Sequence, residues 1–548
     1  MANLMRTVSI IVACTLFVLS GADAVADSYP IVDTQQDQCY DTSQTIGCPD
    51  TDSPFFGQDA HYQGRASSYH DNGDGTVSDL NTGLMWQKTP AEKVTYAEAV
   101  AGADTCALAG YHDWRLPTIK ELYSLMDFRG IDPSGWEGTD PSGLTPFIDT
   151  DFFDFEYGDT EIGDRIIDAQ YWSSTEYVST TMNNDATTFG VNFADGRIKG
   201  YPSEAVGPVG QQTTKASFVR FVRGNSMYGV NDYYDNGDGT VSDSATGLMW
   251  MQNDSDSGMT WPQALDYAED LQYAGYDDWR LPNVKELQSI VDYTRSPATT
   301  NSAAIDPIFN TSTILDEGGD INYPFFWTGT THINWSNYPG TYADYLAFGE
   351  ALGFMEAPPG SGIYMLMDVH GAGAQRSDPK VGDPADWPYG HGPQGDVIRI
   401  YNYVRCVRDI DMSADSDGDG IGSDGDSSGT AGDNPCIGGN TENCDDNCPE
   451  TYNPDQADSD NDGVGDVCEA CCVGSRGNVD NDPEDIVSLG DLTALVDVLF
   501  ISLSDPECWY EANVDASQPE GPGSISLGDL TALIDVLFIS LDSPPACP

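Results

Sequence analysis

Residues 69–87, YHDNGDGTVSDLNTGLMWQ, return almost unchanged as YYDNGDGTVSDSATGLMWM at residues 233–251. A second pair follows, because AGYHDWRLPTIKELYSLMD at 109–127 returns as AGYDDWRLPNVKELQSIVD at 274–292. Long motifs that return in the same order indicate tandem homologous domains rather than a short-period solenoid. One domain type, present twice, therefore decides the fold of the chain.

A third motif closes each copy: FVRFVRGN at 218–225 returns as YVRCVRDI at 403–410. These repeats, with the terminal sequences, divide the chain into six predicted parts: a signal peptide at 1–24, an N-terminal segment at 25–68, domains at 69–225 and 226–410, an acidic segment at 411–470 and a terminal module at 471–548.

Turn residues predict a hairpin at the start of each domain. Asn72-Gly73 and Asp74-Gly75 favour a tight turn before the alternating Thr76-Val77-Ser78. The acidic residues of DNGDGTVSD also permit a cation-binding loop, which is the alternative to a hairpin with an acidic turn.

Helices follow the hairpin, and strands end the domain. Thr95 and Glu98 form a capping box ahead of helical spacing that reaches Leu108. Pro117 opens a second helix. Strands are expected around Tyr171, Phe189–Phe193 and Phe218–Val222. The class is therefore α+β.

The motifs GDGTVSD, TGLMW, WRLP, KEL, YWSST and VRCVR together resemble the Lcl C-terminal domain family of bacterial surface proteins. The resemblance implies an exported protein with two tandem C-type-lectin-like domains, and it implies surface attachment or glycan binding. Members of this family often carry two Cys in one domain. Here Cys106 lies in the first domain and Cys406 in the second, so a bridge between them or two unpaired, buried thiols are expected.

Trp114-Arg115-Leu116-Pro117 has the appearance of a catalytic motif. An Arg beside a buried Trp before a helix more often forms a structural ion pair or stack, and we interpret this motif in that way. No catalytic residues are predicted, because no Ser/His/Asp or Cys/His spacing can be assigned to a triad.

Residues 368–399 of the second domain have no counterpart in the first and read as a long Gly/Pro-rich loop. Such loops tend to carry binding residues. A well-ordered structural loop is the alternative. The predicted ligand-binding residues are His332, Asp368, His370, Arg376, Asp378 and His391.

The acidic segment has its clearest motif at residues 446–468, DNCPETYNPDQADSDNDGVGDVC. Closely spaced carboxylates repel one another unless a cation lies among them, and Ca²⁺ takes six to eight oxygens. The run resembles a thrombospondin type 3 repeat, and residues 413–426 form a partial copy. A disordered acidic linker is the alternative. The predicted Ca²⁺ ligands are Asp415, Asp417, Asp419, Asp446, Asp458, Asp460, Asp462 and Asp466.

The terminal module contains a second duplication, SLGDLTALVDVLFISL at 488–503 and SLGDLTALIDVLFISL at 526–541. An acidic loop before each helix resembles the EF-hand half-sites of a dockerin, although the loops exceed the usual 12 residues. This implies a small all-α module that binds Ca²⁺ and docks on a cohesin-like receptor. A two-helix, disulfide-clasped module without Ca²⁺ is the alternative. The expected ligands are Asn478, Asp480, Asp482, Asp491, Asn513, Asp515, Ser517 and Asp529.

Charge and cysteine content indicate the compartment. The chain carries 89 acidic and 22 basic residues, a net charge of −67, which excludes nucleic acid and disfavours sulfated glycans as partners. An apolar run at 8–19 predicts a secretory signal, and no later stretch predicts a transmembrane span. Of the 13 Cys, Cys14 leaves with the signal peptide and twelve remain. An even number of Cys in an exported chain favours disulfides such as Cys39–Cys48, Cys436–Cys444 and Cys448–Cys468.

Together these features predict a secreted, Ca²⁺-stabilised surface or matrix protein that recognises a glycan, a surface polymer or a protein. An enzyme acting on an extracellular polymer and a scaffold subunit delivered by its dockerin-like end are the alternatives.

Overall fold

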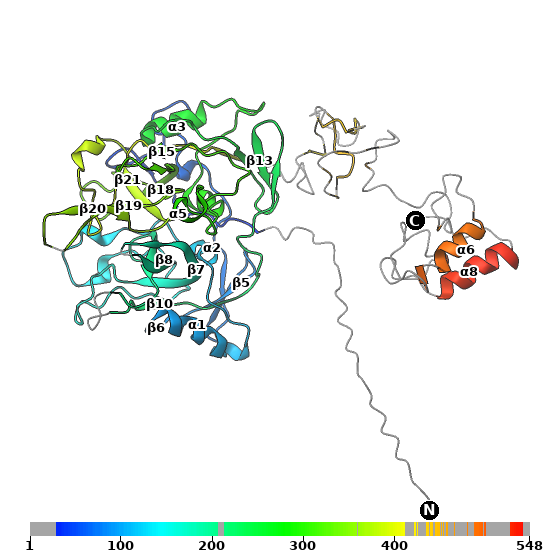
Figure 1. Cartoon of the computed structure of the whole chain (residues 1–548), viewed down its shortest axis with the longest axis horizontal. Coiled ribbons are helices and arrows are strands. Elements are labelled where there is room, and N and C mark those ends of the chain that lie inside the picture. The colour runs from blue at the N-terminus through cyan, green and yellow to red at the C-terminus, as the bar shows by residue number, and fades with distance from the viewer. Residues whose placement is uncertain are drawn as a thin grey trace, which may run out of the picture. The chain divides into compact units, whose positions relative to one another are not determined.

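The computed structural model describes residues 29–182, 184–206, 213–358 and 360–410, together with short groups beyond residue 410 that include 434–437, 444–449, 487–496 and 527–540. The chain forms two compact units, Met1–Ile410 and Asp411–Pro548. The first unit is mixed α and β with mostly sheet, and it holds both repeats, as the sequence predicted (Figure 1).

Each repeat begins with a small antiparallel sheet. In the first repeat its order is β11 (Val222–Gly224), β5 (Leu84–Gln87), β4 (Thr76–Asp79) and β3 (Tyr69–Asp71); in the second it is β12 (Tyr233–Asp235), β13 (Thr240–Asp243), β14 (Leu248–Met251) and β22 (Val407–Asp409). The predicted hairpin is confirmed, because Gly73 and Gly75 adopt positive φ angles and Asp71 accepts a hydrogen bond from the Gly73 amide. The acidic residues of this motif therefore hold a turn.

Two short helices follow in each repeat: α1 (Tyr96–Thr105) and α2 (Ile119–Ser124) in the first, α3 (Trp261–Glu269) and α4 (Val284–Ser289) in the second. The predicted capping box of Thr95 and Glu98 is present. The second helix begins after Thr118 rather than at Pro117, because the Thr118 hydroxyl caps it by accepting from the Glu121 amide.

An eight-stranded sheet joins the repeats. Its order is β17 (Phe325–His332), β18 (Tyr342–Ala347), β21 (Gln375–Pro379), β9 (Arg197–Pro202), β8 (Asp185–Asn192), β7 (Gln170–Thr181), β10 (Ser217–Val219) and β6 (Ala91–Val94). Strands β9 and β21 are the third strands of equivalent meanders, and they meet antiparallel at Ile198 and Gln375. The repeats lie side by side, blue to cyan and green to yellow in Figure 1.

Equivalent lysines connect the repeats in both directions. Lys120 Nζ donates to the Ser289 carbonyl at 2.6 Å, and Lys285 Nζ donates to the Ser124 carbonyl at 2.9 Å. The four residues occupy equivalent positions of the repeated KEL motif. Such reciprocity is the signature of an isologous, two-fold interface. The duplicated domain therefore packs as an internal pseudo-dimer.

The N-terminal segment crosses this interface. Gln36 donates to the carbonyls of Phe128 in the first repeat and Thr331 in the second. Asp59 is buried and accepts from the hydroxyls of Thr34 and Thr330. The segment is therefore part of the core that unites the repeats.

The arginines of the repeated motifs have structural partners. Arg115 and Arg280 each form two hydrogen bonds with the Glu six residues ahead. Arg220 donates to the carbonyls of Gln87, Lys88 and Asp154. The structural interpretation of the Trp-Arg-Leu-Pro motif agrees with these contacts.

The cysteines follow the predictions in part. The disulfides Cys39–Cys48 and Cys436–Cys444 are present. Cys448 is also disulfide-bonded, while its predicted partner Cys468 lies outside the described residues. The predicted bridge between Cys106 and Cys406 is absent, since the two thiols are free and pack in separate apolar clusters of their own repeats. Cys406 is buried, whereas Cys106 is partly exposed.

Small elements decorate the first unit. They are β1 (Cys39–Tyr40), β2 (Thr45–Ile46), η1 (Asp59–His61), η2 (Leu108–Gly110), η3 (Pro133–Gly135), η4 (Pro141–Gly143), α5 (Pro297–Thr300), β15 (Ile314–Leu315), β16 (Ile321–Asn322), β19 (Leu352–Glu356), β20 (Tyr364–Asp368) and η5 (Pro384–Asp386). The hairpin β19–β20 is the main addition to the second repeat.

In the second unit, α6 (Leu489–Val496) and α8 (Leu527–Phe538) pack through a small core that contains Leu495 and Leu533. Among the described helices of the chain, none is both long and apolar enough to cross a membrane.

Candidate functional site

A cavity of about 910 Å³ lies between the two repeats, beside the β9–β21 junction. The first repeat contributes β9 and the region around η3, and the second contributes the ends of β17 and β18, β21 and residues 391–398. The main-chain contacts Asp132 N to Ile333 O and Trp335 N to Asp132 O, both 2.8 Å, hold the two walls together. The size falls within the range of ligand sites.

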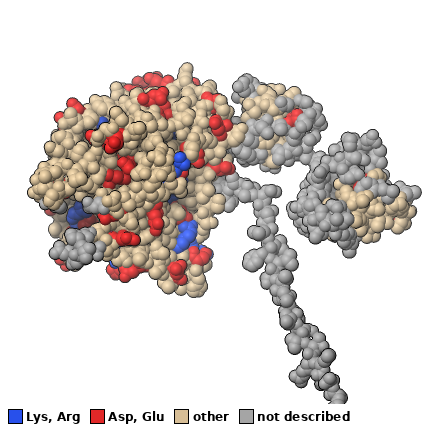
Figure 2. Space-filling model, in the orientation of Figure 1, with Lys and Arg blue, Asp and Glu red and all other residues tan. Residues whose placement is uncertain are grey.

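Basic side chains gather in this cavity. Five of the 22 Lys and Arg residues of the chain line it: Arg165, Arg197, Lys199, Lys215 and Arg376. Figure 2 shows acidic groups spread over the visible face of the first unit, with Lys and Arg at few places. The lining also contains Asp132, Asp195 and Asp396, so five cations exceed three carboxylates there, in a chain where acidic residues outnumber basic ones.

Carboxylates position the central cations. Arg197 pairs with Asp132 at 2.7 Å and with Asp195 at 3.5 Å, and Lys199 pairs with Asp195 at 3.0 Å. Arg376 pairs with Asp396. These contacts fix the cations at the cavity wall.

Arg376 keeps donor capacity after pairing. Its Nε and Nη1 groups are buried and have no hydrogen-bond partner among the described residues, and the same holds for Arg197 Nε. A buried donor without a partner is costly, and a carboxylate or sulfate accepts two parallel N–H groups of a guanidinium. The two arginines are therefore suited to an anionic group that enters the cavity.

Lys199 and Lys215 of the cavity lining are also suited to an anionic ligand. Burial lowers the pKa of Lys199 to about 8, while Asp195 acts in the opposite direction. Burial also lowers the pKa of Lys215, whose Nζ donates to Gln170 and lies 5.6 Å from the centre of the Tyr201 ring. An incoming anion would favour the charged form of both lysines.

Aromatic side chains complete the wall. Trp136 of the first repeat and Trp335 of the second contact each other edge to face, with ring centres 4.8 Å apart. Trp335 is 38% exposed. Aromatic faces next to fixed polar groups are common in sites that bind ring-shaped ligands.

His332 and His391 of the predicted ligand-binding residues line the cavity, together with Arg376. His332 is fully buried, with Nδ1 2.9 Å from Asp344 and Nε2 3.3 Å from Asp132. Although burial lowers its pKa, the two carboxylates outweigh burial and raise it. The carboxylates therefore favour the charged form of His332 and hold its ring in place, and His391 lies at the exposed edge.

The other three predicted residues have structural contacts. His370 is buried behind the cavity, 2.9 Å from Asp396, and burial lowers its pKa to about 4. Asp368 accepts from the amides of His370 and Gly371 and from the Tyr177 hydroxyl. Asp378 accepts from the amides of Arg399 and Ile400. Both carboxylates hold turns.

The expectation of one long loop over 368–399 is wrong, because β21 (375–379) is a strand inside the large sheet and the counterpart of β9. Sequence comparison missed this equivalence, since the two strands share little sequence. It also missed Asp195, Arg197 and Lys199, although their alternation in ADGRIKG places charged side chains on one face of a strand.

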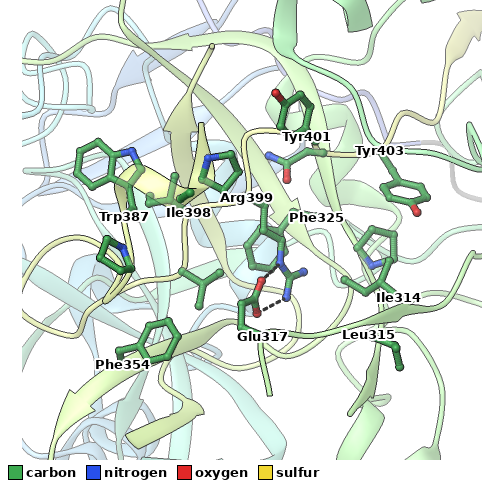
Figure 3. A pocket seen from close by; sticks show the side chains of 16 residues that line it. Ile314, Leu315, Glu317, Phe325, Phe354, Trp387, Ile398, Arg399, Tyr401 and Tyr403 are labelled. Carbon is green, nitrogen blue, oxygen red and sulfur yellow. Dashed lines mark hydrogen bonds and ion pairs between the residues drawn. The ribbon is translucent and has the colours of Figure 1, made fainter. Parts of the chain in front are cut away.

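A second hollow of about 490 Å³ lies on the other side of residues 384–399 (Figure 3). Phe325, Phe354, Trp387, Tyr401 and Tyr403 line it, and an ion pair between Arg399 and Glu317 crosses its centre. We call it the aromatic groove.

Four of the predicted Ca²⁺ ligands lie among the described residues, and all are buried: Asp446, Asp458, Asp491 and Asp529. Asp446 accepts from the Cys448 amide, and Asp491 accepts from the Ser488 amide at the start of α6. The remaining predicted ligands lie outside the described residues: Asp415, Asp417, Asp419, Asp460, Asp462, Asp466, Asn478, Asp480, Asp482, Asn513, Asp515 and Ser517.

Residues 75–223 and 239–361 match the family model described as Lcl C-terminal domain. The predicted resemblance is thereby confirmed for both repeats. The second match ends in the β19–β20 turn, so β21 and the cavity residues 376–398 lie beyond it. A comparison with curated proteins and one with solved structures found no match.

Proposed function

We propose that this chain, whose first unit contains two Lcl C-terminal domains, recognises an extracellular polymer that carries acidic groups, and that the inter-repeat cavity is the recognition site. One observation supports this above all: the side chains of Arg376 and Arg197 line a cavity beside three further cations, and each keeps buried N–H groups that have no partner among the described residues. The trio Arg376, Arg197 and Lys199 would hold a carboxylate or sulfate.

The charge of the remaining chain restricts which acidic polymers can be the ligand. With a net charge of −67, the surface outside the cavity repels a densely sulfated or densely carboxylated polymer. A single acidic group between uncharged sugar units enters the cavity without bringing further anions against the acidic surface. We therefore favour a polysaccharide with widely spaced uronates.

The finer assignments complete the proposal. Each repeat would be a C-type-lectin-like domain of a secreted or surface-attached adhesion protein. The second unit would comprise a thrombospondin type 3 segment and a dockerin-like module, stabilised by Ca²⁺ and able to dock on a cohesin-like receptor. The buried positions of Asp446, Asp458, Asp491 and Asp529 support the Ca²⁺ assignment.

An oligosaccharide with one glucuronate among neutral sugars tests the cavity, with its carboxyl-reduced form as the matched probe. The unaltered protein should bind the acidic probe at least tenfold more tightly than the reduced one. Arg376→Gln should remove most of this preference, a loss of about tenfold or more, which is the effect of at least one charge-assisted hydrogen bond. Titration calorimetry measures the affinities of both proteins for both probes.

Two further variants separate binding from folding. Lys215→Ala should weaken binding of the acidic probe without loss of thermal stability, because Lys215 has no ion-pair partner among the described residues. Arg408→Ala, whose ion pair with Asp278 lies outside the cavity lining, should leave binding of both probes unchanged. Equal binding of the two probes would contradict the proposal, and cleavage of the acidic probe would replace it with the enzyme alternative.

Ca²⁺ should bind and compact the second unit. Residues 409–548 hold 32 acidic residues and one basic residue, and repulsion among these carboxylates disfavours a compact segment unless a cation binds. We expect binding with dissociation constants on the order of 10⁻⁴–10⁻³ M and a smaller radius of gyration of the whole chain in Ca²⁺ than in chelator. Calorimetry without Ca²⁺ heat, and scattering that does not change, would refute the assignment.

A further inference from the structure

The aromatic groove differs in charge from the cavity. Among the described residues that line it, only Glu317 and Arg399 are charged, and they neutralise each other through contacts of 3.1 and 3.2 Å. The groove therefore carries no net charge, in a chain whose surface is strongly acidic. An uncharged ligand is the one that this environment accepts without an electrostatic cost.

The walls of the groove offer ring faces. In Figure 3, Trp387 and Phe354 lie on one side of the ion pair, and Tyr403 lies on the other. Tyr401, above them in this view, is 50% exposed. Large apolar rings that remain open to solvent in a concave site mark a surface for binding rather than for core packing.

Packed aromatic rings and hydrogen-bonded backbone hold the floor of the groove, and an ion pair lies on it. The Arg399 guanidinium lies 3.9 Å from the centre of the Phe325 ring, and Phe325 stacks on Tyr345 at 4.4 Å. Asp378 accepts hydrogen bonds from the amides of Arg399 and Ile400, which fixes the backbone below the groove. Arg399 supplies donors and Glu317 supplies acceptors side by side, so a ligand hydroxyl can accept from one and donate to the other.

We propose that the aromatic groove binds a short run of uncharged sugar units. A sugar ring has an apolar face of C–H groups that packs on Trp387 and Tyr401, and hydroxyls at its edge that bond to Arg399 and Glu317. The volume of about 490 Å³ lies within the range of small-ligand sites. This binding is separate from anion recognition in the cavity.

The two sites share a wall. Ile398 lines both of them, and the Trp387 ring contacts the ring of His391, which lines the cavity, at 5.1 Å. One polymer that crosses residues 387–398 would place neutral units in the groove and an acidic unit in the cavity. This addition rests on the proposed function, whereas neutral binding in the groove does not.

The test uses the full chain and three neutral probes: cellohexaose, xylohexaose and mannohexaose. At least one should bind with a dissociation constant below about 1 mM. Trp387→Ala and Tyr401→Ala should each weaken it about tenfold or more, and Trp387→Phe should retain most of the affinity, since an aromatic face remains. Arg376→Gln, which affects the acidic probe, should leave the neutral probe unchanged.

Three results would overturn the inference. The first is no binding of any neutral probe. The second is unchanged affinity in folded Trp387→Ala or, if that variant unfolds, in Tyr401→Ala. The third is a loss of affinity for the neutral probe in Arg376→Gln as large as that in the groove variants, which would place the neutral sugar in the cavity. If the groove binds no neutral sugar, the difference in affinity between the acidic and the carboxyl-reduced probe can still be present. The two proposals can therefore fail separately.

Discussion

Arg280→Ala is expected to lower the free energy of unfolding by about 3–5 kcal/mol, the usual effect of removing one partner from a buried ion pair. The guanidinium is 5% exposed and the Glu286 carboxylate 10% exposed. Their two contacts measure 2.7 and 2.8 Å, and Glu286 also accepts from the Asn283 amide at the start of α4. Without Arg280, a carboxylate remains buried without its counter-charge.

Chemical denaturation followed by circular dichroism measures this loss, and the repeats provide matched controls. The equivalent Arg115 is 32% exposed, so Arg115→Ala should have a smaller effect. Arg408→Ala breaks a pair whose Asp278 is 55% exposed, and it should cost no more than about 1 kcal/mol. Equal losses in the free energy of unfolding for Arg280→Ala and Arg408→Ala would show that burial does not govern how much these ion pairs stabilise the protein.

Asp59→Asn should make the protein more stable at pH 8 while changing little at pH 4. Burial raises the pKa of Asp59 to about 7 from an ordinary value of 3.8, against the lowering effect of hydrogen bonds from Thr330 and Thr34. The folded protein therefore binds this proton more tightly than the unfolded chain does. The corresponding stability is fully present below pH 3.8 and is lost as the pH rises through about 7.

The size of the effect follows from the shift. Three pKa units at about 1.4 kcal/mol each give roughly 4 kcal/mol as an upper limit at pH 8. Asn keeps an oxygen for the two threonine hydroxyls and carries no charge, so the variant avoids this loss. Other buried groups, such as Asp368 with a pKa raised to about 7, titrate in both proteins and cancel in the difference.

Denaturation curves at several pH values measure the difference between variant and parent. Asp113→Asn is the control, because its hydrogen bond with Arg223 lowers the pKa of Asp113. A lowered carboxyl pKa changes stability only below its ordinary value, so this difference should be flat from pH 5 to pH 8. A flat difference for Asp59→Asn as well would mean that Asp59 is charged in the folded protein.

The local elements of the fold could be predicted from the sequence because their causes lie within a few residues. The turn glycines Gly73 and Gly75 and the capping box of Thr95 and Glu98 act over four residues or fewer. The WRLP motif needed only a slightly longer reach, since Arg115 meets a Glu six positions ahead. Duplication of long motifs was sufficient to identify two domains of one family.

The overall charge of the chain led the prediction of partners away from anionic ligands. The five cations of the cavity lie between residues 165 and 376, and neither repeat alone holds them all. Net charge describes long-range repulsion, whereas binding depends on the few groups within reach of the ligand. The preference against densely charged polymers remains in the proposed function, with a local exception at the cavity.

The sequence by itself determined the tandem α+β domains, their hairpins, capped helices and structural arginines, and two of the disulfides. Only the tertiary structure decided that β9 pairs with β21, that Lys120 and Lys285 connect the repeats, and that His332 lies between Asp132 and Asp344. Asp132 and His332 are 200 positions apart in the chain. Local patterns encode dihedral angles and burial, whereas contacts over such separations depend on how finished elements pack, which short-range patterns do not specify.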